Sequence, residues 1–444
     1  MEDECIGFLG LTYSGKDILV RLLLGDLEAA GHESSFFWEG KRLMDFEVLK
    51  KKIYKISALN YRIDNWTVAE YIGLVDEGNL YTRKSAEKLE MEVKYCFRQM
   101  GIEFDVSQKM CDLSEKQKRI VDLVKAYKIG AKIVVIEDEL EGMSLTDICN
   151  FATEMKKMIH GKMSVIVNSH SNEIMSYLSD KYIIFNKGYI VKKCEKSYIK
   201  NTTHLEKFLL GESKISEGMT VSKQQIGIRE KEIIYQVQNM YFLDKRFYNL
   251  SFSRGEVVTL LTLDRTKKEQ LFGALSGRRK SEHVSYILNS KYYKNVDMEV
   301  FIKERIVSVK DIGTDMEIFP YLSIGDNLLI PSLHKLSSVE FIISAKRIHR
   351  MLADSVKLVT NEHNVKGKKL NINELITVTL ERWLIYKPQI IVLLEPFALC
   401  DMKGVSIIKS YIEQFVRLGV TVIIIKTREE YIEDISDRIL RIDE

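Results

Sequence analysis

The segment from residue 10 to residue 17, GLTYSGKD, has residue types that bind phosphate groups. Glycines allow the backbone turns that aim N–H groups at an anion, and a lysine after them can reach the outer phosphates of a nucleotide. The final aspartate stands where such a loop normally carries a magnesium-binding hydroxyl, and its carboxylate can itself bind Mg²⁺. A turn without a ligand is the alternative interpretation. The residues that we expect to contact phosphate or metal are Gly10, Ser14, Gly15, Lys16 and Asp17.

Apolar patterning around this segment predicts the elements that would hold it. Residues 6–9 form an apolar run of strand length, and apolar residues then recur at helical spacing from Ile18 to Leu23, just before Gly25. Residues 69–128 lack strand-like alternation and are predicted to be mostly helical. Further strands are predicted at Ile133–Ile136, Val165–Val167 and Tyr182–Phe185. The pattern predicts an α/β domain in which helices cover a sheet, with a helical insertion.

The sequence resembles itself at a long and nearly constant period, which predicts two copies of one domain. WTVAEYI from Trp66 resembles LSIGDNL from Leu322, 256 residues later. KIVVIEDELEGMS from Lys132 resembles QIIVLLEPFALCD from Gln389, 257 residues later. A polar stretch without strong periodicity separates the copies. We therefore expect a first domain at residues 1–198, a linker at 199–230 and a second domain at 231–444.

Composition excludes several classes of protein. With 66 Lys and Arg against 63 Asp and Glu, the net charge of the 444 residues is +3, so bulk charge gives no support to nucleic-acid binding. The acidic start leads into no signal-peptide-like run, and no apolar run approaches the roughly 18 residues of a membrane span. Six cysteines without a CxxC pair are typical of a reducing compartment. We expect a cytoplasmic protein that neither binds nucleic acid nor inserts into a membrane.

Four further motifs follow the phosphate-binding segment in order. LSEKQ, which is Leu113, Ser114, Glu115, Lys116 and Gln117, resembles the LSGGQ signature of ABC transporters. VVIED, ending at Asp138, resembles their Walker B strand, Gly142 matches the D-loop glycine, and NSH, ending at His170, resembles the switch histidine. Over both copies, the chain resembles the fused ATP-binding subunits of simple-sugar importers. The resemblance implies two tandem P-loop nucleotide-binding domains of the ABC type, ATP and Mg²⁺ as ligands, membrane permease subunits as partners, and a place at the inner face of the membrane.

The resemblance also implies roles for three acidic or basic residues. With Gly142 as the anchor, Glu137 takes the metal role beside Asp17, and Asp138 takes the role of the base that polarises the attacking water. Moving the register by one residue gives the pair Asp138 and Glu139 but breaks the spacing to Gly142. His170 takes the switch role. The alternatives are a solvated acidic corner and a surface histidine.

The departures from the family pattern predict damaged nucleotide sites. In the family each site combines the phosphate loop of one copy with the signature of the other. The second copy has LNINELI from Leu370 as its signature and TLDRTKKE from Thr262 as its loop, and neither contains a glycine. Leu394 takes the metal position of the second copy, although Glu395 remains beside it.

Other family features are altered outside these loops. No glutamine lies near Ala58, where the family's Q-loop would touch the permease. The first copy begins directly at its phosphate-loop strand, so we expect it to lack the preceding strands that carry an adenine-stacking aromatic. The second copy keeps such a segment, with Phe242, Phe247 and Tyr248.

Three functional hypotheses follow. The first is a degenerate ATP-binding subunit with weak nucleotide binding at the first loop, little or no hydrolysis, and a scaffold or permease-docking role. The second is an active, asymmetric ABC ATPase that energises sugar uptake, and the third is a soluble regulatory pseudo-ATPase outside transport. The sequence leaves catalysis open between them. A translation factor of the ABC family is less favoured, because the linker is short and lacks a long charged helical pair.

Overall fold

The computed structural model describes residues 4–443 apart from 13, 27–35, 44–45, 58–63, 74–85, 138–139, 141, 200–231, 243–246, 279–282, 295, 311 and 334–369. The chain divides into two compact units, Met1–Thr220 and Val221–Glu444, which are described separately below. The expected linker lies outside the described residues except for Ile199. No helix in the described ranges combines the length and the apolar character needed to cross a bilayer.

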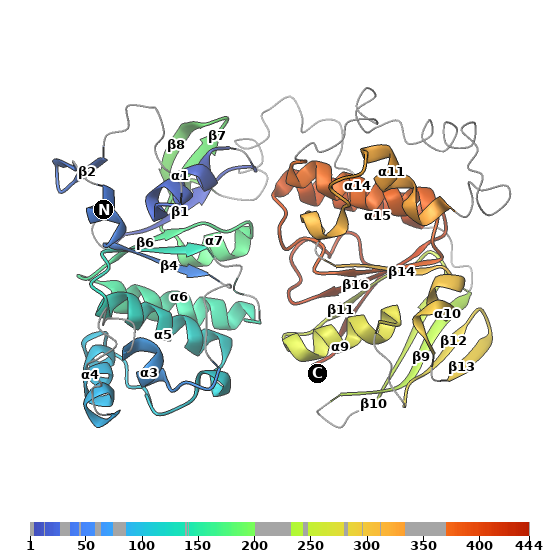
Figure 1. Cartoon of the computed structure of the whole chain (residues 1–444), viewed down its shortest axis with the longest axis horizontal. Coiled ribbons are helices and arrows are strands. Elements are labelled where there is room, and N and C mark those ends of the chain that lie inside the picture. Colours follow the sequence, from blue (N-terminus) through green and yellow to red (C-terminus); the bar gives the residue numbers. More distant parts are fainter. Residues whose placement is uncertain are drawn as a thin grey trace. The chain divides into compact units, whose positions relative to one another are not determined.

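A six-stranded sheet forms the centre of the first unit, in the order β4-β5-β6-β1-β7-β8. All neighbours are parallel except β7 and β8, which form an antiparallel hairpin. Figure 1 shows α1 and α6 on opposite sides of this sheet. The elements are β1 (Cys5–Leu9), α1 (Lys16–Leu24), β4 (Ile53–Ser57), β5 (Ile133–Glu137), α6 (Leu145–Ile159), β6 (Ser164–Val167), α7 (Asn172–Leu178), β7 (Lys181–Asn186) and β8 (Tyr189–Glu195). Two short strands, β2 (Phe36–Trp38) and β3 (Lys41–Leu43), pair with each other, and α2 (Phe46–Lys50) follows them.

These elements form where the sequence predicts them, for identifiable reasons. The apolar runs of β1, β5 and β6 are buried because helices cover both faces of the parallel sheet. Helix α1 ends at Gly25, whose left-handed conformation (φ 76°) lets its N–H bond the carbonyls of the last turn. Ser144 and Asp147 form a capping box that begins α6.

The predicted helical insertion of the first unit is confirmed where the structure describes it. It contains α3 (Val68–Gly73), α4 (Ala86–Gln99) and α5 (Glu115–Lys128). The hydroxyl of Tyr71 on α3 donates to Asp122 on α5 at 2.8 Å, and the Lys125 ammonium lies 3.7 Å from the centre of the Tyr71 ring. These contacts fix the two helices against each other.

The second unit contains two sheets. Its parallel sheet has the order β14-β15-β16-β11-β17, and an antiparallel sheet has the order β10-β9-β12-β13. The strands are β9 (Ile233–Tyr241), β10 (Phe247–Ser253), β11 (Val257–Leu261), β12 (Ser285–Leu288), β13 (Lys291–Lys294), β14 (Ile306–Val309), β15 (Ile390–Leu394), β16 (Thr421–Lys426) and β17 (Arg438–Arg441). The main helices are α9 (Arg265–Ser276), α10 (Met298–Lys303), α11 (Ile324–Leu329), α14 (Ile372–Tyr386) and α15 (Met402–Arg417).

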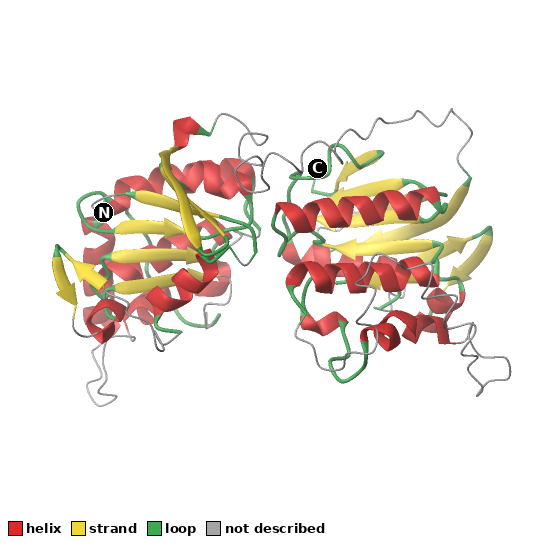
Figure 2. Cartoon of the chain, turned by 90° about the horizontal axis from the view of Figure 1, so that it is seen from above, coloured by secondary structure: helices red, strands yellow, loops and turns green. Residues whose placement is uncertain are grey.

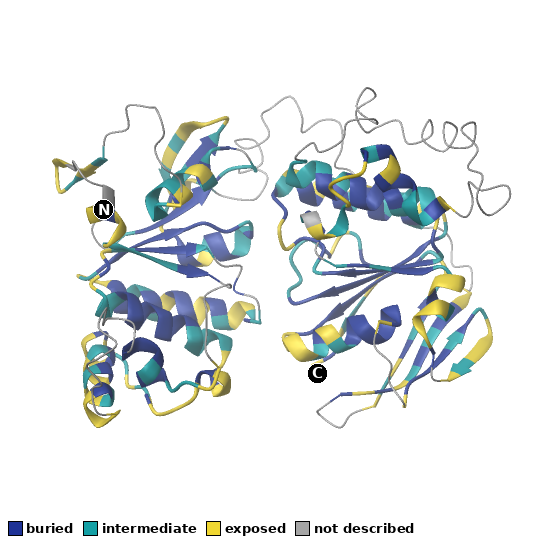
Figure 3. Ribbon diagram, in the orientation of Figure 1, coloured by how far each residue is buried: buried dark blue, intermediate teal, exposed yellow. Residues whose placement is uncertain are grey.

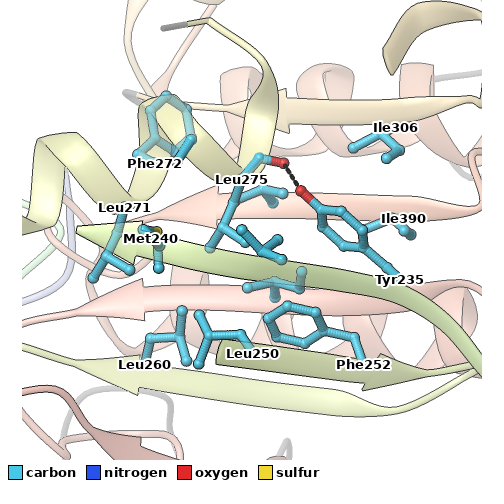
Figure 4. Packing of buried hydrophobic residues seen from close by; sticks show 14 of the residues in the cluster. Tyr235, Met240, Leu250, Phe252, Leu260, Leu271, Phe272, Leu275, Ile306 and Ile390 are labelled. Carbon is cyan, nitrogen blue, oxygen red and sulfur yellow. Dashed lines mark hydrogen bonds between the residues drawn. The ribbon is translucent and has the colours of Figure 1, made fainter. Parts of the chain in front are cut away.

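A large apolar core joins the two sheets of the second unit to α9. Tyr235 belongs to this core and is fully buried, and its hydroxyl donates to the carbonyl of Leu275 at 3.1 Å (Figure 4). Figure 2 shows helices on both faces of the parallel sheet, and Figure 3 shows that the strands of that sheet are mostly buried. The aromatic segment predicted before the loop strand is confirmed as the hairpin β9–β10, where Phe242 and Tyr248 pack with ring centres 5.0 Å apart.

The parallel sheets of the two units have the same topology, which supports the predicted repeat. The first five strands of one order, β4-β5-β6-β1-β7, match β14-β15-β16-β11-β17 of the other. Strand register then gives equivalent residues. Cys5 pairs with Val165 in the first unit, and Val257 pairs with Val422 in the second. The offset is therefore 257 residues for β6 and β16 but 252 for β1 and β11, and it makes Lys268 the counterpart of Lys16. This confirms TLDRTKKE as the counterpart of the first loop.

Candidate functional site

The loop between β1 and α1 in the first unit has a backbone shaped for close approach. Gly15 has φ 100°, and a Cβ there would lie 3.1 Å from the Cα of Gly188 in the β7–β8 turn. The N–H of Gly188 donates to the carbonyl of Ser14 at 2.8 Å, which ties the hairpin to the loop. A Cβ on Gly10 would lie 2.2 Å from the Ser14 hydroxyl oxygen. Only glycine therefore fits at either position in this conformation.

The start of α1 is open to an anion. Gly15 is the N-cap residue, and no described side chain accepts a hydrogen bond from the first turn as a cap. The first N–H groups of a helix have no partner within the helix and carry partial positive charge. A phosphate group is a suitable ligand for such a helix start, so the predicted positions of Gly10, Ser14 and Gly15 fit phosphate binding.

Lys16, the residue expected to reach the phosphates, is buried and already has partners inside the protein. Its residue surface is 1% exposed, and its Nζ donates to Asn168 Oδ1 at 2.7 Å and to Asp17 Oδ1 at 2.8 Å. The Asn168 amide Nδ2 donates to the same Asp17 oxygen at 3.1 Å. Lys16, Asp17 and Asn168 therefore form a closed ring of hydrogen bonds.

The ring extends to the predicted metal ligand at the end of β5. Asn168 Nδ2 lies 3.3 Å from Glu137 Oε1, and the other Glu137 oxygen forms an ion pair with Lys55 on β4. Asp17 and Glu137 thus approach a single amide group. No three His, Cys, Asp or Glu side chains gather into a possible metal site within the described ranges.

The charge state of Asp17 follows from its neighbours. Burial by itself would raise the pKa of this carboxyl. The Lys16 ammonium, together with hydrogen bonds from Lys16 and Asn168, outweighs burial and holds the pKa of Asp17 below its usual range. His170 acts on Asp17 in the same direction through its charge. Asp17 is therefore a carboxylate at neutral pH, beside the place where phosphate would bind.

The other predicted site residues have separate places in the first unit. Asp138 lies outside the described residues, so its role as base stays a prediction. His170 follows β6 and lies near enough to Asp17 for their charges to interact. Gly142 adopts φ 81°.

The signature segment forms the start of α5. Ser114 accepts a hydrogen bond from the Gln117 N–H, and the Gln117 side chain accepts one from the Ser114 N–H at 2.9 Å. Glu115 pairs with Lys118 at 2.7 Å, and Lys116 pairs with Glu154 at 2.6 Å. Leu113 is buried. These polar groups stabilise the helix start of the first unit itself.

In the second unit, a carboxylate occupies the start of the corresponding helix. Asp264 is the N-cap of α9, and its Oδ1 accepts from the N–H groups of Thr266 at 2.7 Å and Lys267 at 3.1 Å. Helix α9 begins at Arg265, three residues before Lys268, whereas α1 begins at Lys16 itself. The loop of the first unit is thus replaced by an additional helical turn whose N–H groups are bonded to Asp264.

The lysine of the second unit is bound to the acid that survives in its Walker B position. Lys268 is 3% exposed, and its Nζ donates to Glu395 Oε1 and to Thr427 Oγ1, both at 2.9 Å. Burial alone would raise the pKa of Glu395, but the charges of Lys268 and Lys426 outweigh it, so this pKa lies below its usual range. Thr427, which takes the switch position of the second copy, contacts this network.

Three contributors to these networks were not singled out from the sequence. Asn168 lies in the NSH motif, and an aspartate such as Asp264 ahead of a helical pattern is an N-cap signal. Lys55 gave no signal, because its pairing with Glu137 depends on β4 lying beside β5. Taken together, the donors of the first unit fit a phosphate group with Mg²⁺ held partly by Asp17 or Glu137, whereas those of the second unit do not fit a nucleotide.

Comparison with solved structures identifies the fold. The archaeal ribosome recycling factor aABCE1, in a complex with a ribosomal stalk protein, matches 99% of this chain and 83% of its own chain at 16% identity and a TM-score of 0.54. A model of ribosome-bound archaeal Pelota and ABCE1 matches 99% of this chain and 72% of its own at 17% identity and a TM-score of 0.59. The chain has the fold of a tandem ABC-type ATPase. The predicted fold class is confirmed, and at these identities the likeness concerns the fold alone.

Several sequence relatives of the chain are named as ATP-binding proteins of sugar import. MglA of Escherichia coli strain K12, a galactose/methyl galactoside import ATP-binding protein, is 21% identical over 444 residues, covering 97% of this chain and 86% of that protein. The MglA protein of Fusobacterium nucleatum is 23% identical over 321 residues, covering 71% of this chain and 62% of that protein's length. No family model matches the sequence. The predicted resemblance to tandem sugar-importer ABC ATPases is confirmed.

Proposed function

We propose that the chain is a degenerate ATP-binding subunit of the sugar-importer kind. It binds nucleotide weakly at the loop around Lys16, hydrolyses little or none, and serves as a scaffold that docks on membrane permease subunits at the inner face of the membrane. Its relatives are import ATP-binding proteins that match nearly the whole chain, which supports the transport setting. Both loop lysines, Lys16 and Lys268, already form hydrogen bonds within the protein. This observation is the main support for proposing that the nucleotide sites are degenerate.

Weak binding at the first loop follows from competition for Lys16. A phosphate must replace hydrogen bonds from Lys16 to Asn168 and Asp17, each of which involves a charged group. Bonds of this kind contribute about 1.5–3 kcal/mol, so their loss offsets much of the energy gained from the phosphate. The Asp17 carboxylate also repels phosphate unless Mg²⁺ lies between them.

Low hydrolysis follows from the acids. Glu137 must leave Lys55 and the Asn168 amide to hold a metal ion, and a misplacement of about 1 Å in a catalytic group can reduce the rate about a hundredfold. In the second unit, Glu395 neutralises Lys268 instead of orienting a water molecule. Glu137 and Glu395 are the Walker B acids that the structure describes, and each is therefore already bound to a lysine.

The test is ATP binding by calorimetry, with and without Mg²⁺, followed by a turnover assay. The wild type should bind with a dissociation constant of roughly 0.1–1 mM, and Lys16→Ala should weaken binding about tenfold or more, a change of about 1.4 kcal/mol. Lys193→Ala, which removes an exposed lysine from β8, is the matched control and should bind like the wild type. Robust magnesium-dependent turnover that Lys16→Ala abolishes would overturn the proposal in favour of the active asymmetric ATPase.

The permease-docking part needs a separate measurement. Affinity purification from detergent-solubilised membranes should recover permease subunits with the tagged full-length chain. Recovery without any membrane protein would contradict docking and favour the soluble regulatory pseudo-ATPase.

A further inference from the structure

We propose that Asn168 is a positioning residue that holds Lys16 away from nucleotide, so that a phosphate group binds the first loop only by displacing the Asn168 amide. This inference rests on the proposed phosphate binding at that loop and concerns its regulation. Asn168 itself need not touch the ligand. It acts through Lys16.

The geometry of the amide supports this role. Asn168 is 5% exposed, and its oxygen accepts from the Lys16 ammonium while its NH₂ group approaches the carboxylates of Asp17 and Glu137. The opposite orientation of the amide would place the NH₂ group against the ammonium and the oxygen against two carboxylates. One orientation therefore satisfies every partner, and the amide is held from three sides.

The second unit shows that the fold does not require a polar residue at this position. Because Val165 is equivalent to Val422, Asn168 is equivalent to Ile425, a fully buried apolar residue on β16. Lys268 is instead held by Glu395 and Thr427. The equivalent lysines thus bind different neighbours in the two units. The amide contact occurs in the first unit, whose loop retains its glycines.

Removal of the amide should favour ligand binding. In Asn168→Ala the ammonium loses a partner at 2.7 Å in the free protein, whereas a bound phosphate would supply oxygen atoms to replace it. The free state is then destabilised relative to the bound state. A residue that merely supports the loop would have the opposite effect, because its loss would disorder the phosphate-binding backbone.

The experiment measures binding of inorganic tripolyphosphate to the full-length chain by calorimetry. Asn168→Ala should bind about tenfold more tightly than the wild type, the loss of one hydrogen bond to a charged group. Thr427→Ala is the matched control, because it removes the corresponding neutral partner of Lys268 in the second unit and should leave the affinity unchanged. In a Lys16→Ala background, Asn168→Ala should have no effect, since the amide acts through the lysine.

The outcomes separate this proposal from the proposed function. Lys16-dependent binding by the wild type with equal or weaker binding by Asn168→Ala overturns the role of Asn168 and leaves the proposed function standing. Binding by Asn168→Ala but not by the wild type supports the role of Asn168 and overturns wild-type nucleotide binding. Absence of binding in both, with melting curves showing folded protein, overturns both. An increase in affinity that persists without Lys16 overturns action through the lysine.

Discussion

Two buried lysines, Lys16 and Lys268, determine the chemistry of the two loops. An isolated buried ammonium is strongly unfavourable, so each lysine needs a partner whether or not nucleotide is present. In the first unit the partners are a neutral amide and a partly exposed carboxylate, and in the second unit a less exposed carboxylate and a hydroxyl. Lys268 is therefore held more strongly by its protein partners than Lys16 is.

The ion pair between Lys268 and Glu395 predicts that Glu395→Gln strongly lowers the stability of the protein. Removing one partner of a buried ion pair leaves an uncompensated charge, which typically costs about 3–5 kcal/mol. We expect a loss of this size in the free energy of unfolding, measured by urea denaturation. Asp434→Asn, which breaks the more exposed pair with Lys409, is the control and should cost less than about 1 kcal/mol. Equal effects of the two substitutions would contradict the buried pair.

The lowered pKa of Glu395 predicts how this effect depends on pH. A carboxyl whose pKa is lower in the folded than in the unfolded state adds stability above the unfolded value, roughly pH 4.3, and loses it as pH falls through the folded value. The destabilisation caused by Glu395→Gln should therefore be full near pH 7 and should shrink below about pH 4. Urea unfolding of both proteins across this range provides the measurement. A difference that grows on acidification would be inconsistent with the lowered pKa.

At the scale of the element, the start of one helix distinguishes the two units. Helix α1 begins after a glycine that leaves its first N–H groups uncapped by any described side chain, whereas α9 begins a turn earlier behind Asp264. A carboxylate in this place interacts favourably with the N–H groups and the helix dipole, as a phosphate does in a binding loop. The additional turn and its cap thus act as an internal substitute for the ligand.

Asp264→Ala tests the cap. Loss of an N-cap side chain typically costs about 1 kcal/mol, and we expect that decrease in the unfolding free energy of the second unit. Asp264→Asn keeps an acceptor oxygen and should lose only a few tenths of a kcal/mol. Circular dichroism during urea unfolding can follow both variants. An Asp264→Ala protein as stable as the wild type would show that the two hydrogen bonds contribute nothing.

Gly15→Ala tests the loop of the first unit. The residue would have to adopt φ 100° and place its Cβ 3.1 Å from the Gly188 backbone. Gly130→Ala is the matched control, because Gly130 has φ 77° but no atom within 4 Å of the added Cβ. Both should lose about 1 kcal/mol or more from the left-handed backbone, with the larger loss at Gly15. Thermal unfolding would reveal the order, and a larger loss at Gly130 would contradict the close approach of the hairpin.

Local elements were predictable from the sequence, but the pairings within the site were not. The strands at Ile133–Ile136 and Val165–Val167 and the end of α1 at Gly25 follow from apolar runs and glycine chemistry, which are local properties. The ring around Lys16 joins residues that are 152 positions apart, so it depends on which strands become neighbours. The motif at residues 168–170 directed attention to His170, while the structure places Asn168 on the lysine.

At the scale of the whole molecule, the repeat predicted from sequence is supported by the matching strand orders of the two units. The period is 257 residues for β5, β6 and β7, yet β1 and β11 are 252 residues apart and β4 and β14 are 253 apart, so most of the difference in length falls after β4 and β14. A single constant offset would therefore place Gly273, rather than Lys268, opposite Lys16. The absence of glycines in the sequence reveals that the loop of the second unit is altered. The strand register is needed to identify Lys268 and the capped helical turn before it as the replacement.

The asymmetry of the two units predicts the response of the whole chain to ligand. In calorimetric scans we expect two unfolding transitions, of which MgATP shifts one upward. Lys16→Ala should abolish the shift, and Glu395→Gln should lower the other transition. At a ligand concentration ten times the dissociation constant, the stabilisation of the first unit would be about 1.4 kcal/mol. A shift of the transition that Glu395→Gln lowers would contradict the assignment of binding to the first unit.

The cap at Asp264 and the ion pair at Glu395 also make the proposed loss of nucleotide binding in the second unit hard to reverse by substitution. Replacing Asp264 alone costs helix stability while Lys268 stays on Glu395. Replacing Glu395 alone leaves a buried ammonium without its carboxylate partner, which is destabilising before any ligand can compensate. Building a nucleotide site there would require several coordinated substitutions, each harmful by itself. Under the proposed function, no single substitution in the second unit would therefore create a nucleotide site there.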